Sequence, residues 1–96
     1  MPDRIHLLGK EILIHYTNSA SRNDTTMGRN DDKMLLITIN EDMPRENKEE
    51  VLLHESIHMI DAHVALGLTE QQTTALSSVL YSFLKDNPAF ITGILK

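Results

Sequence analysis

Residues 45–65 contain neither Gly nor Pro, and this segment constrains the fold of the 96-residue chain more than any other feature. Pro44 precedes it, and Gly67 stands where the residue after a helix end commonly adopts a left-handed conformation. Apolar side chains recur within the segment at the spacing of one helical face: Leu53, Ile57, Ile60 and Val64. The sequence therefore predicts a long helix over residues 45–65.

A second helix is predicted to begin after Thr69. Thr69 and Gln72 have the spacing of a capping box, in which each side chain binds the backbone N–H of the other residue. The pair Asn87-Pro88 ends the pattern, because a proline cannot continue a helix. Five apolar side chains at helical spacing are expected to form its buried stripe: Leu76, Val79, Leu80, Phe83 and Leu84.

Two short strands are predicted over residues 4–17, where apolar and polar side chains alternate on either side of Gly9-Lys10. A glycine at the first central position favours a type II′ turn there. The β-branched run 34–39 predicts a further strand. Residues 18–33 are polar and lack periodicity, which predicts a mobile loop with an irregular strand near Met27.

This order of elements predicts a single α+β domain over residues 1–96. We expect a small antiparallel sheet of about three strands with two C-terminal helices packed on one face. The chain contains no repeat, and no linker is long enough to separate two domains.

Composition narrows the range of functions. The absence of cysteine excludes disulfides, thiolate metal sites and cysteine nucleophiles. The net charge is −5 without a basic block, so nucleic acid is not an expected partner. No run approaches the roughly 18 apolar residues of a membrane span, and we expect a cytoplasmic protein without membrane contact. Because so short a chain has a small core, a bound metal or a partner chain would add stability.

The predicted first helix contains the motif His54-Glu55-Ser56-Ile57-His58. Both histidines lie on nearly the same face one turn apart, so both imidazoles can bind one ion. Zinc accepts neutral imidazole nitrogen, and Glu55 lies beside this face, where it can act as general base on a metal-activated water. The composition yields the pattern by chance only roughly 0.02 times, so we interpret it as a metal-binding motif.

The stretch VLLHESIHMID, residues 51–61, resembles the active-site helix of zincin metallopeptidases. Residues 70–77 are similar to the glutamate helix of gluzincins of the ImmA/IrrE type, in which a Phe/Leu-Ala pair follows the Glu by six and seven residues. Leu76-Ser77 fills those places here. The chain is also similar in size to the single-domain minigluzincins.

The resemblance extends over residues 44–88 and implies a minimal zinc metallopeptidase that hydrolyses peptide bonds in a protein or peptide substrate. It implies one zinc ion per chain, bound by His54, His58 and Glu70, with Glu55 as general base.

Glu70 is the only Glu after His58, so a gluzincin site requires it as the third ligand. A first helix that continued to Leu66 would require a sharp return of the chain to bring Glu70 to the metal. A helix that ended near residues 62–63 would leave seven residues, which span roughly 23 Å and return easily.

Other polar side chains have weaker claims to the site. His63 lies on the opposite side of the helix from His54, and the Gly and His that metzincins need after the second histidine are absent. Asp61 could orient a ligand histidine through its other nitrogen, or it could be a solvated acid. Structural positions are expected for His6, His15 and Tyr81.

Three interpretations of the apolar C-terminal residues 89–96 stay open: docking on the chain's own core, a contact within a homodimer, and occlusion of the cleft in a latent, zymogen-like form. A peptide substrate is expected to pair with an edge strand around residues 34–39. Two rival hypotheses are a non-catalytic module stabilised by zinc that binds another protein, and a small acidic regulator without metal.

Overall fold

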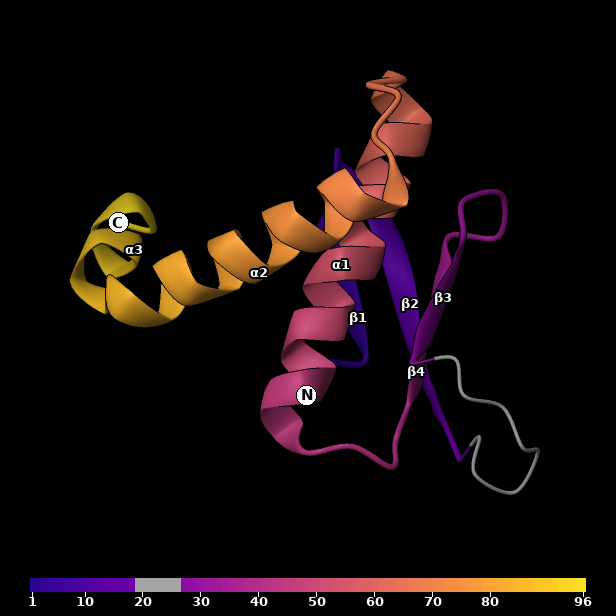
Figure 1. Ribbon diagram of the computed structural model, residues 1–96, viewed down its shortest axis with the longest axis horizontal. Helices are drawn as coiled ribbons and strands as arrows, with labels where there is room; N and C mark the ends of the chain where they lie inside the picture. Colours follow the sequence, from indigo (N-terminus) through magenta and orange to yellow (C-terminus); the bar gives the residue numbers. More distant parts are fainter. Residues whose placement is uncertain (19–26) are drawn as a thin grey trace.

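The computed structural model describes residues 1–18 and 27–96. Figure 1 shows helix α1 lying along the sheet, α2 crossing α1 and leading away from the sheet, and α3 at the far end of α2. The elements in chain order are β1 (Arg4–Leu7), β2 (Lys10–Thr17), β3 (Gly28–Asp31), β4 (Leu36–Asn40), α1 (Arg45–Val64), α2 (Glu70–Asp86) and α3 (Pro88–Ile94). The α+β class is confirmed.

The sheet is mixed, with strand order β1-β2-β4-β3. The pairs β1–β2 and β3–β4 are antiparallel, whereas β2 and β4 are parallel, from Leu13 opposite Leu36 to Thr17 opposite Asn40. The predicted small sheet with C-terminal helices is confirmed, but the sheet has four strands instead of about three, and the parallel pair β2–β4 makes it mixed instead of antiparallel. The chain enters β3 at one edge and returns as β4 between β2 and β3, which makes β4 run in the direction of β2.

Strand β3 has the sequence Gly-Arg-Asn-Asp, so it lacks the apolar alternation that identifies a strand. It lies where an irregular strand near Met27 was expected, and that expectation is confirmed. The part of the predicted loop that falls on residues 19–26 lies outside the described residues.

The first hairpin turn differs from the predicted one, and the structure contains a second that was not predicted. Leu7 pairs with Lys10, so the first turn consists of Leu8 and Gly9, and φ is +51° and +77° at these two residues. Positive φ at both positions defines a type I′ turn, not the type II′ turn expected around Gly9-Lys10. In the second turn, the Asp31 carboxylate accepts hydrogen bonds from the backbone N–H groups of residues 33 and 34. This turn delays the start of β4 from residue 34 to Leu36.

The core lies between α1 and one face of the sheet. Alternate residues of β2 and β4 point into it and meet Met59 of α1. Its buried members are Ile12, Ile14, Ile37, Ile39 and Met59. Because α1 alone covers this face and α2 packs on α1, the prediction that both helices pack on the sheet was wrong.

Helix α1 ends one residue before the predicted limit. Ala65 adopts the left-handed conformation, with φ +54°, and its N–H binds the carbonyl oxygen of Asp61. Gly67 is also left-handed, with φ +73°, as the sequence indicated. The two left-handed residues turn the chain back toward α1.

The predicted capping box opens α2. Thr69 Oγ1 accepts from Gln72 N at 3.0 Å, and Gln72 Oε1 accepts from Thr69 N at 2.9 Å. The predicted buried stripe was wrong, because the buried residues of α2 are Thr73 and Ser77. Four members of the stripe are exposed, namely Leu76, Val79, Phe83 and Leu84. The fifth, Leu80, is half-buried.

The C-terminal segment forms α3, a helix that the sequence analysis did not identify. Phe90 packs edge-to-face on Phe83 of α2, with the ring centroids 5.9 Å apart, and no residue of α3 is buried. Since α3 lies far from the sheet core (Figure 1), docking on that core is not observed. Of the helices in the described ranges, none has the length and apolarity that a membrane crossing requires.

The turn between β1 and β2 yields a prediction for stability. Leu8 is 59% exposed and holds a φ that leucine rarely adopts. We predict that Leu8→Asn raises the free energy of unfolding by about 1 kcal/mol, because Asn-Gly is favoured in type I′ turns. Leu8→Val should lower it, since β-branched residues disfavour positive φ. Urea denaturation measures both changes, and an Asn variant no more stable than the wild type would contradict the turn assignment.

Candidate metal centre

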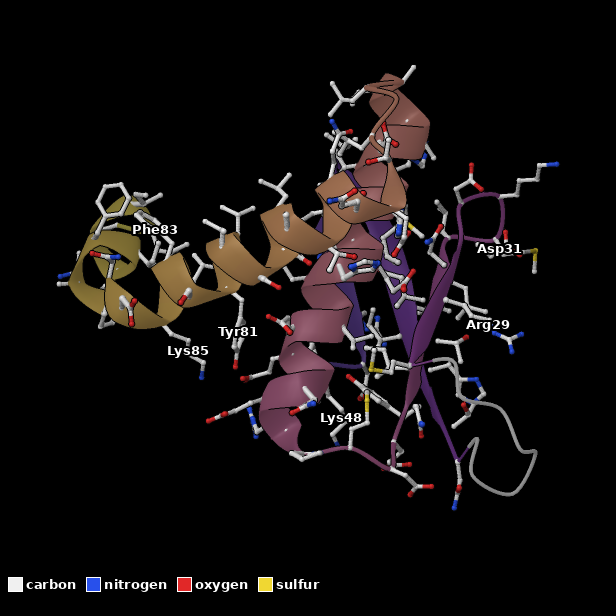
Figure 2. The ribbon with its side chains drawn as sticks, in the orientation of Figure 1. Arg29, Asp31, Lys48, Tyr81, Phe83 and Lys85 are labelled. Carbon is white, nitrogen blue, oxygen red and sulfur yellow. The ribbon has the colours of Figure 1, made fainter. Side chains whose placement is uncertain are left out.

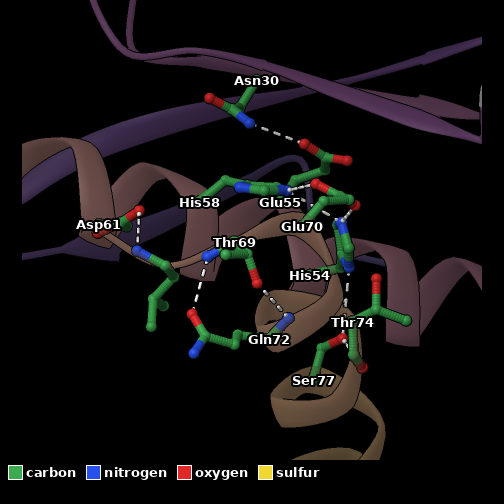
Figure 3. A network of polar contacts seen from close by, with 11 residues as sticks. Asn30, His54, Glu55, His58, Asp61, Thr69, Glu70, Gln72, Thr74 and Ser77 are labelled. Atoms are coloured by element: carbon green, nitrogen blue, oxygen red, sulfur yellow. Dashed lines mark hydrogen bonds and ion pairs between the residues drawn. The ribbon is translucent and has the colours of Figure 1, made fainter. Parts of the chain in front are cut away.

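Three side chains from two helices converge on one point. His54 and His58 project from α1, and Glu70 is the first residue of α2. The Glu70 carboxylate places one oxygen 2.8 Å from His54 Nε2 and the other 2.7 Å from His58 Nε2 (Figure 3). The two Nε2 atoms are 3.1 Å apart. These three residues, which the resemblance implied as metal ligands, form a group that could hold a metal ion.

The distances suit a single ion. Two ligand atoms at about 2.0–2.1 Å from a tetrahedral zinc ion lie roughly 3.3–3.4 Å apart. The observed separations of 3.1, 2.8 and 2.7 Å are slightly shorter, so the side chains need only a small outward movement to surround an ion. Two imidazoles and one carboxylate are also the ligands found in catalytic zinc sites.

Ser77 of α2 lies beside the ring of His54. Ser77 Oγ donates to the carbonyl oxygen of Thr74 at 3.0 Å and lies 3.4 Å from His54 Nδ1. In the tautomer that carries its proton on Nδ1, His54 donates to this oxygen and directs its Nε2 lone pair at Glu70. Lone pairs of an imidazole and a carboxylate repel each other at 2.8 Å unless a proton or a metal ion lies between them. The donor set thus fits a bound cation.

The link between the helices, residues 65–69, brings Glu70 back to the histidines. Asp61 on the last turns of α1 accepts hydrogen bonds from Gly67 N at 2.8 Å and from Leu68 N at 3.2 Å. The link thereby makes the sharp return that a helix ending at Val64 requires. Asp61 holds the link that precedes Glu70, and within the described part of the chain its carboxylate hydrogen-bonds this link and no ligand histidine. The hypothesis that it orients such a histidine is not supported.

Glu55 lies on the sheet side of the ligand group. Its side chain is buried, with 7% of the residue exposed, and Asn30 Nδ2 of β3 donates to its Oε1 at 2.8 Å (Figure 3). Gly28 allows β3 to approach α1 this closely. A Cβ at Gly28 would lie 2.5 Å from Val51 Cγ1 and 3.3 Å from Glu55 Oε2, so any larger residue would push the strand away.

The ligand group opens into a pocket of about 270 Å³ between β3, α1 and α2. Met27 and Gly28 line one side, Thr74 and Ser78 line the other, and Glu55 also contributes to the wall. The strand beside this pocket is β3, which is an edge of the described sheet. The expectation that residues 34–39 form the edge strand was wrong, because β4 lies between β2 and β3.

A second polar contact ties α2 to α1. The Tyr81 hydroxyl donates to Glu49 Oε1 at 2.8 Å, and Lys85 Nζ lies 3.3 Å from the same oxygen. The hydrogen bond from Tyr81 lowers the pKa of the Glu49 carboxyl, and Lys85 adds to this effect. Figure 2 shows Tyr81 and Lys85 extending from the same side of α2. The structural position expected for Tyr81 is confirmed.

The remaining histidines lie elsewhere. His63 Nδ1 is 2.8 Å from the carbonyl oxygen of Met59 on its own helix. His6 and His15 are exposed on β1 and β2, as predicted.

Three residues that contact Glu55 or His54 were not predicted from the sequence to do so: Gly28, Asn30 and Ser77. Gly28 and Asn30 belong to a polar strand that has no periodicity, so no local signal marks them. Ser77 occupies the position at which ImmA/IrrE-type gluzincins have a small residue, and this could have indicated that it packs close to His54.

No protein-family model, curated protein or solved structure matches this chain. Function is therefore inferred from the site itself.

The ligand group could hold one metal ion, and zinc binding tests this. Loss of a residue that hydrogen-bonds a ligand lowers metal affinity roughly 10–100-fold, and loss of a ligand itself should lower it further. We therefore expect Glu70→Ala to weaken zinc binding by more than about 100-fold, measured by competition with a chromophoric chelator. Glu46→Ala removes the same charge from the exposed first turn of α1 and should leave affinity unchanged. Equal affinity of Glu70→Ala and wild type would exclude Glu70 as a ligand.

Proposed function

We propose that this protein is a zinc-dependent metallopeptidase of gluzincin type that hydrolyses peptide bonds in protein or peptide substrates. The observation that carries the proposal is the convergence of His54, His58 and Glu70 beside a pocket whose wall includes Glu55, which is buried and hydrogen-bonded to Asn30. The expected cytoplasmic location rests on composition, and the resemblance to ImmA/IrrE-type proteins rests on the two motifs; both remain predictions.

The residues of the site have distinct tasks in this proposal. When bound, zinc supplies a Lewis acid that activates water and polarises a substrate carbonyl. His54 and His58 serve as neutral ligands and Glu70 as an anionic one. Glu55 takes the proton from the attacking water and returns it to the leaving amine. The Asn30 amide holds Oε1 of Glu55, so that the other carboxylate oxygen is available for proton transfer.

Strand β3 offers a place for the substrate backbone. It pairs with β4 along one side and forms an edge of the described sheet next to the pocket. An extended peptide could add to this edge by main-chain hydrogen bonds, with its scissile bond facing the ligand group. The proposed substrate is therefore an unfolded or extended segment, because a folded chain could not present its backbone to the edge.

Substitution of the general base tests the activity. We expect Glu55→Gln to bind zinc normally and to hydrolyse an unfolded protein at least about 100-fold more slowly, because a general base contributes about 10²–10⁴-fold. Glu50→Gln makes the same change on the same helix at another residue that lines the pocket, and it should retain activity. Undiminished turnover by Glu55→Gln would contradict the role of Glu55.

The way α2 packs favours a second candidate, in which the metal has a structural task. Helix α2 buries only the small residues Thr73 and Ser77 on the body of the protein, so an ion shared by α1 and α2 would contribute much of their association. In this candidate the chain is a non-catalytic module that binds another protein.

Chelation distinguishes the two candidates. The buried core consists of strand residues and Met59, and it contains none of the three ligands. We therefore expect EDTA to abolish hydrolysis and to lower the melting temperature while a cooperative unfolding transition persists. Circular dichroism during heating, with and without EDTA, measures this. Loss of the entire transition on chelation would favour the structural candidate.

A further inference from the structure

An exposed apolar surface lies on one side of α2 and on α3, where Phe83 packs on Phe90. We call it the distal face, and it consists of Leu76, Val79, Phe83, Phe90 and Ile94. These residues are between 41% and 66% exposed. Figure 1 shows that this part of the chain projects from the body formed by α1 and the sheet, and Figure 2 shows Phe83 on the side of α2 opposite Tyr81 and Lys85. The contacts that hold α2 to α1 therefore leave this face uncovered.

The chain exposes more surface than a compact monomer of the same mass, which accords with the projection of α2 and α3 from the body. The chain exposes 6573 Å², whereas a compact monomer of 10.9 kDa exposes about 5600 Å². The excess of roughly 1000 Å² is comparable to the ~800 Å² that each partner buries in a stable complex. The radius of gyration, 13.7 Å, also exceeds the ~12.5 Å of a compact domain of this length.

The charge distribution favours a second copy of the same chain as the partner. Lys85 and Asp86 are the only charged residues between positions 71 and 95, although the chain as a whole has a net charge of −5. Two copies can therefore meet through this region without repulsion between like charges. The polar side of α2 carries Ser, Thr and Gln, whereas helices that bind membrane surfaces carry Lys and Arg there.

The spacing of the face suits a pair of helices. Leu76, Val79 and Phe83 follow one another at intervals of three and four residues, the pattern of a seam between two packed helices. We propose that two copies of this chain form a twofold dimer through their distal faces, with the α2 helices antiparallel and Val79 near the axis. A parallel pair would bring both protein bodies to the same end, whereas the antiparallel pair places α3 of each copy beside the body of the other.

The dimer leaves the metal centre accessible. Thr74 and Ser78 line the metal pocket, and by helical geometry they point away from the direction of Leu76 and Val79. The proposal does not require the proposed peptidase activity, and a test of one does not decide the other.

Sedimentation equilibrium of the metal-loaded chain tests the proposal. We expect the wild type to have twice the monomer mass of 10.9 kDa, and Val79→Glu to raise the dimer dissociation constant more than about 100-fold. Because Val79 is 66% exposed, its replacement should leave the circular dichroism spectrum unchanged. Ser82→Glu adds the same charge to an exposed site of α2 outside the distal face and should still dimerise. A monomeric wild type, or a Val79→Glu variant that dimerises as well as the wild type, would overturn the proposal.

The absence of cysteine allows a second, geometric test. A residue near the axis meets its own copy, so Val79→Cys should form an intermolecular disulfide in high yield on mild oxidation. Ser82→Cys provides the matched control and should cross-link far more slowly. Equal cross-linking of the two variants would overturn the placement of the axis and with it the proposed interface.

Discussion

Two hydrogen bonds to one carboxylate hold the link that brings Glu70 to the two histidines. Asp61 accepts from the backbone N–H groups of Gly67 and Leu68, and it thereby holds the short link that returns the chain to α1. Without that return Glu70 would lie beyond the end of the helix, far from His54 and His58. Asp61, which is not a member of the ligand group, therefore helps to position Glu70. The hydrogen bonds at the end of α1 thus affect the geometry of the site.

Helix α2 is oriented by its polar side and not by its apolar one. Glu70, Ser77 and Tyr81 all contact α1 through polar atoms, so these contacts decide which side of α2 faces the body. The apolar residues lie around the flank of the helix and find little to cover them. In most small domains an apolar stripe orients a helix. Here the candidate ligand group and hydrogen bonds do so, which explains how one helix can carry both this group and a separate apolar surface.

The parts of the site that the sequence predicted depend on local geometry. The spacing of His54 and His58 follows from the rise and turn of a helix, and the start of α2 follows from the capping box at Thr69. The parts that it did not predict depend on contacts distant in sequence. Nothing near Gly28 or Asn30 indicates that a polar strand will pair with β4 and contact Glu55. Similarly, periodicity identified the apolar side of α2 correctly but carried no information about what would cover it.

The two proposals meet in α2, and thermodynamic linkage connects them. Few apolar contacts hold this helix on the body, so part of the cost of binding an ion at Glu70 is the ordering of the helix itself. A partner that packs on the distal face orders the same helix. If both proposals hold, dimerisation orders the helix before zinc binds and thereby raises zinc affinity. By reciprocity, bound zinc lowers the dimer dissociation constant by the same factor. Such coupling needs no contact between the two surfaces, because a single helix carries both.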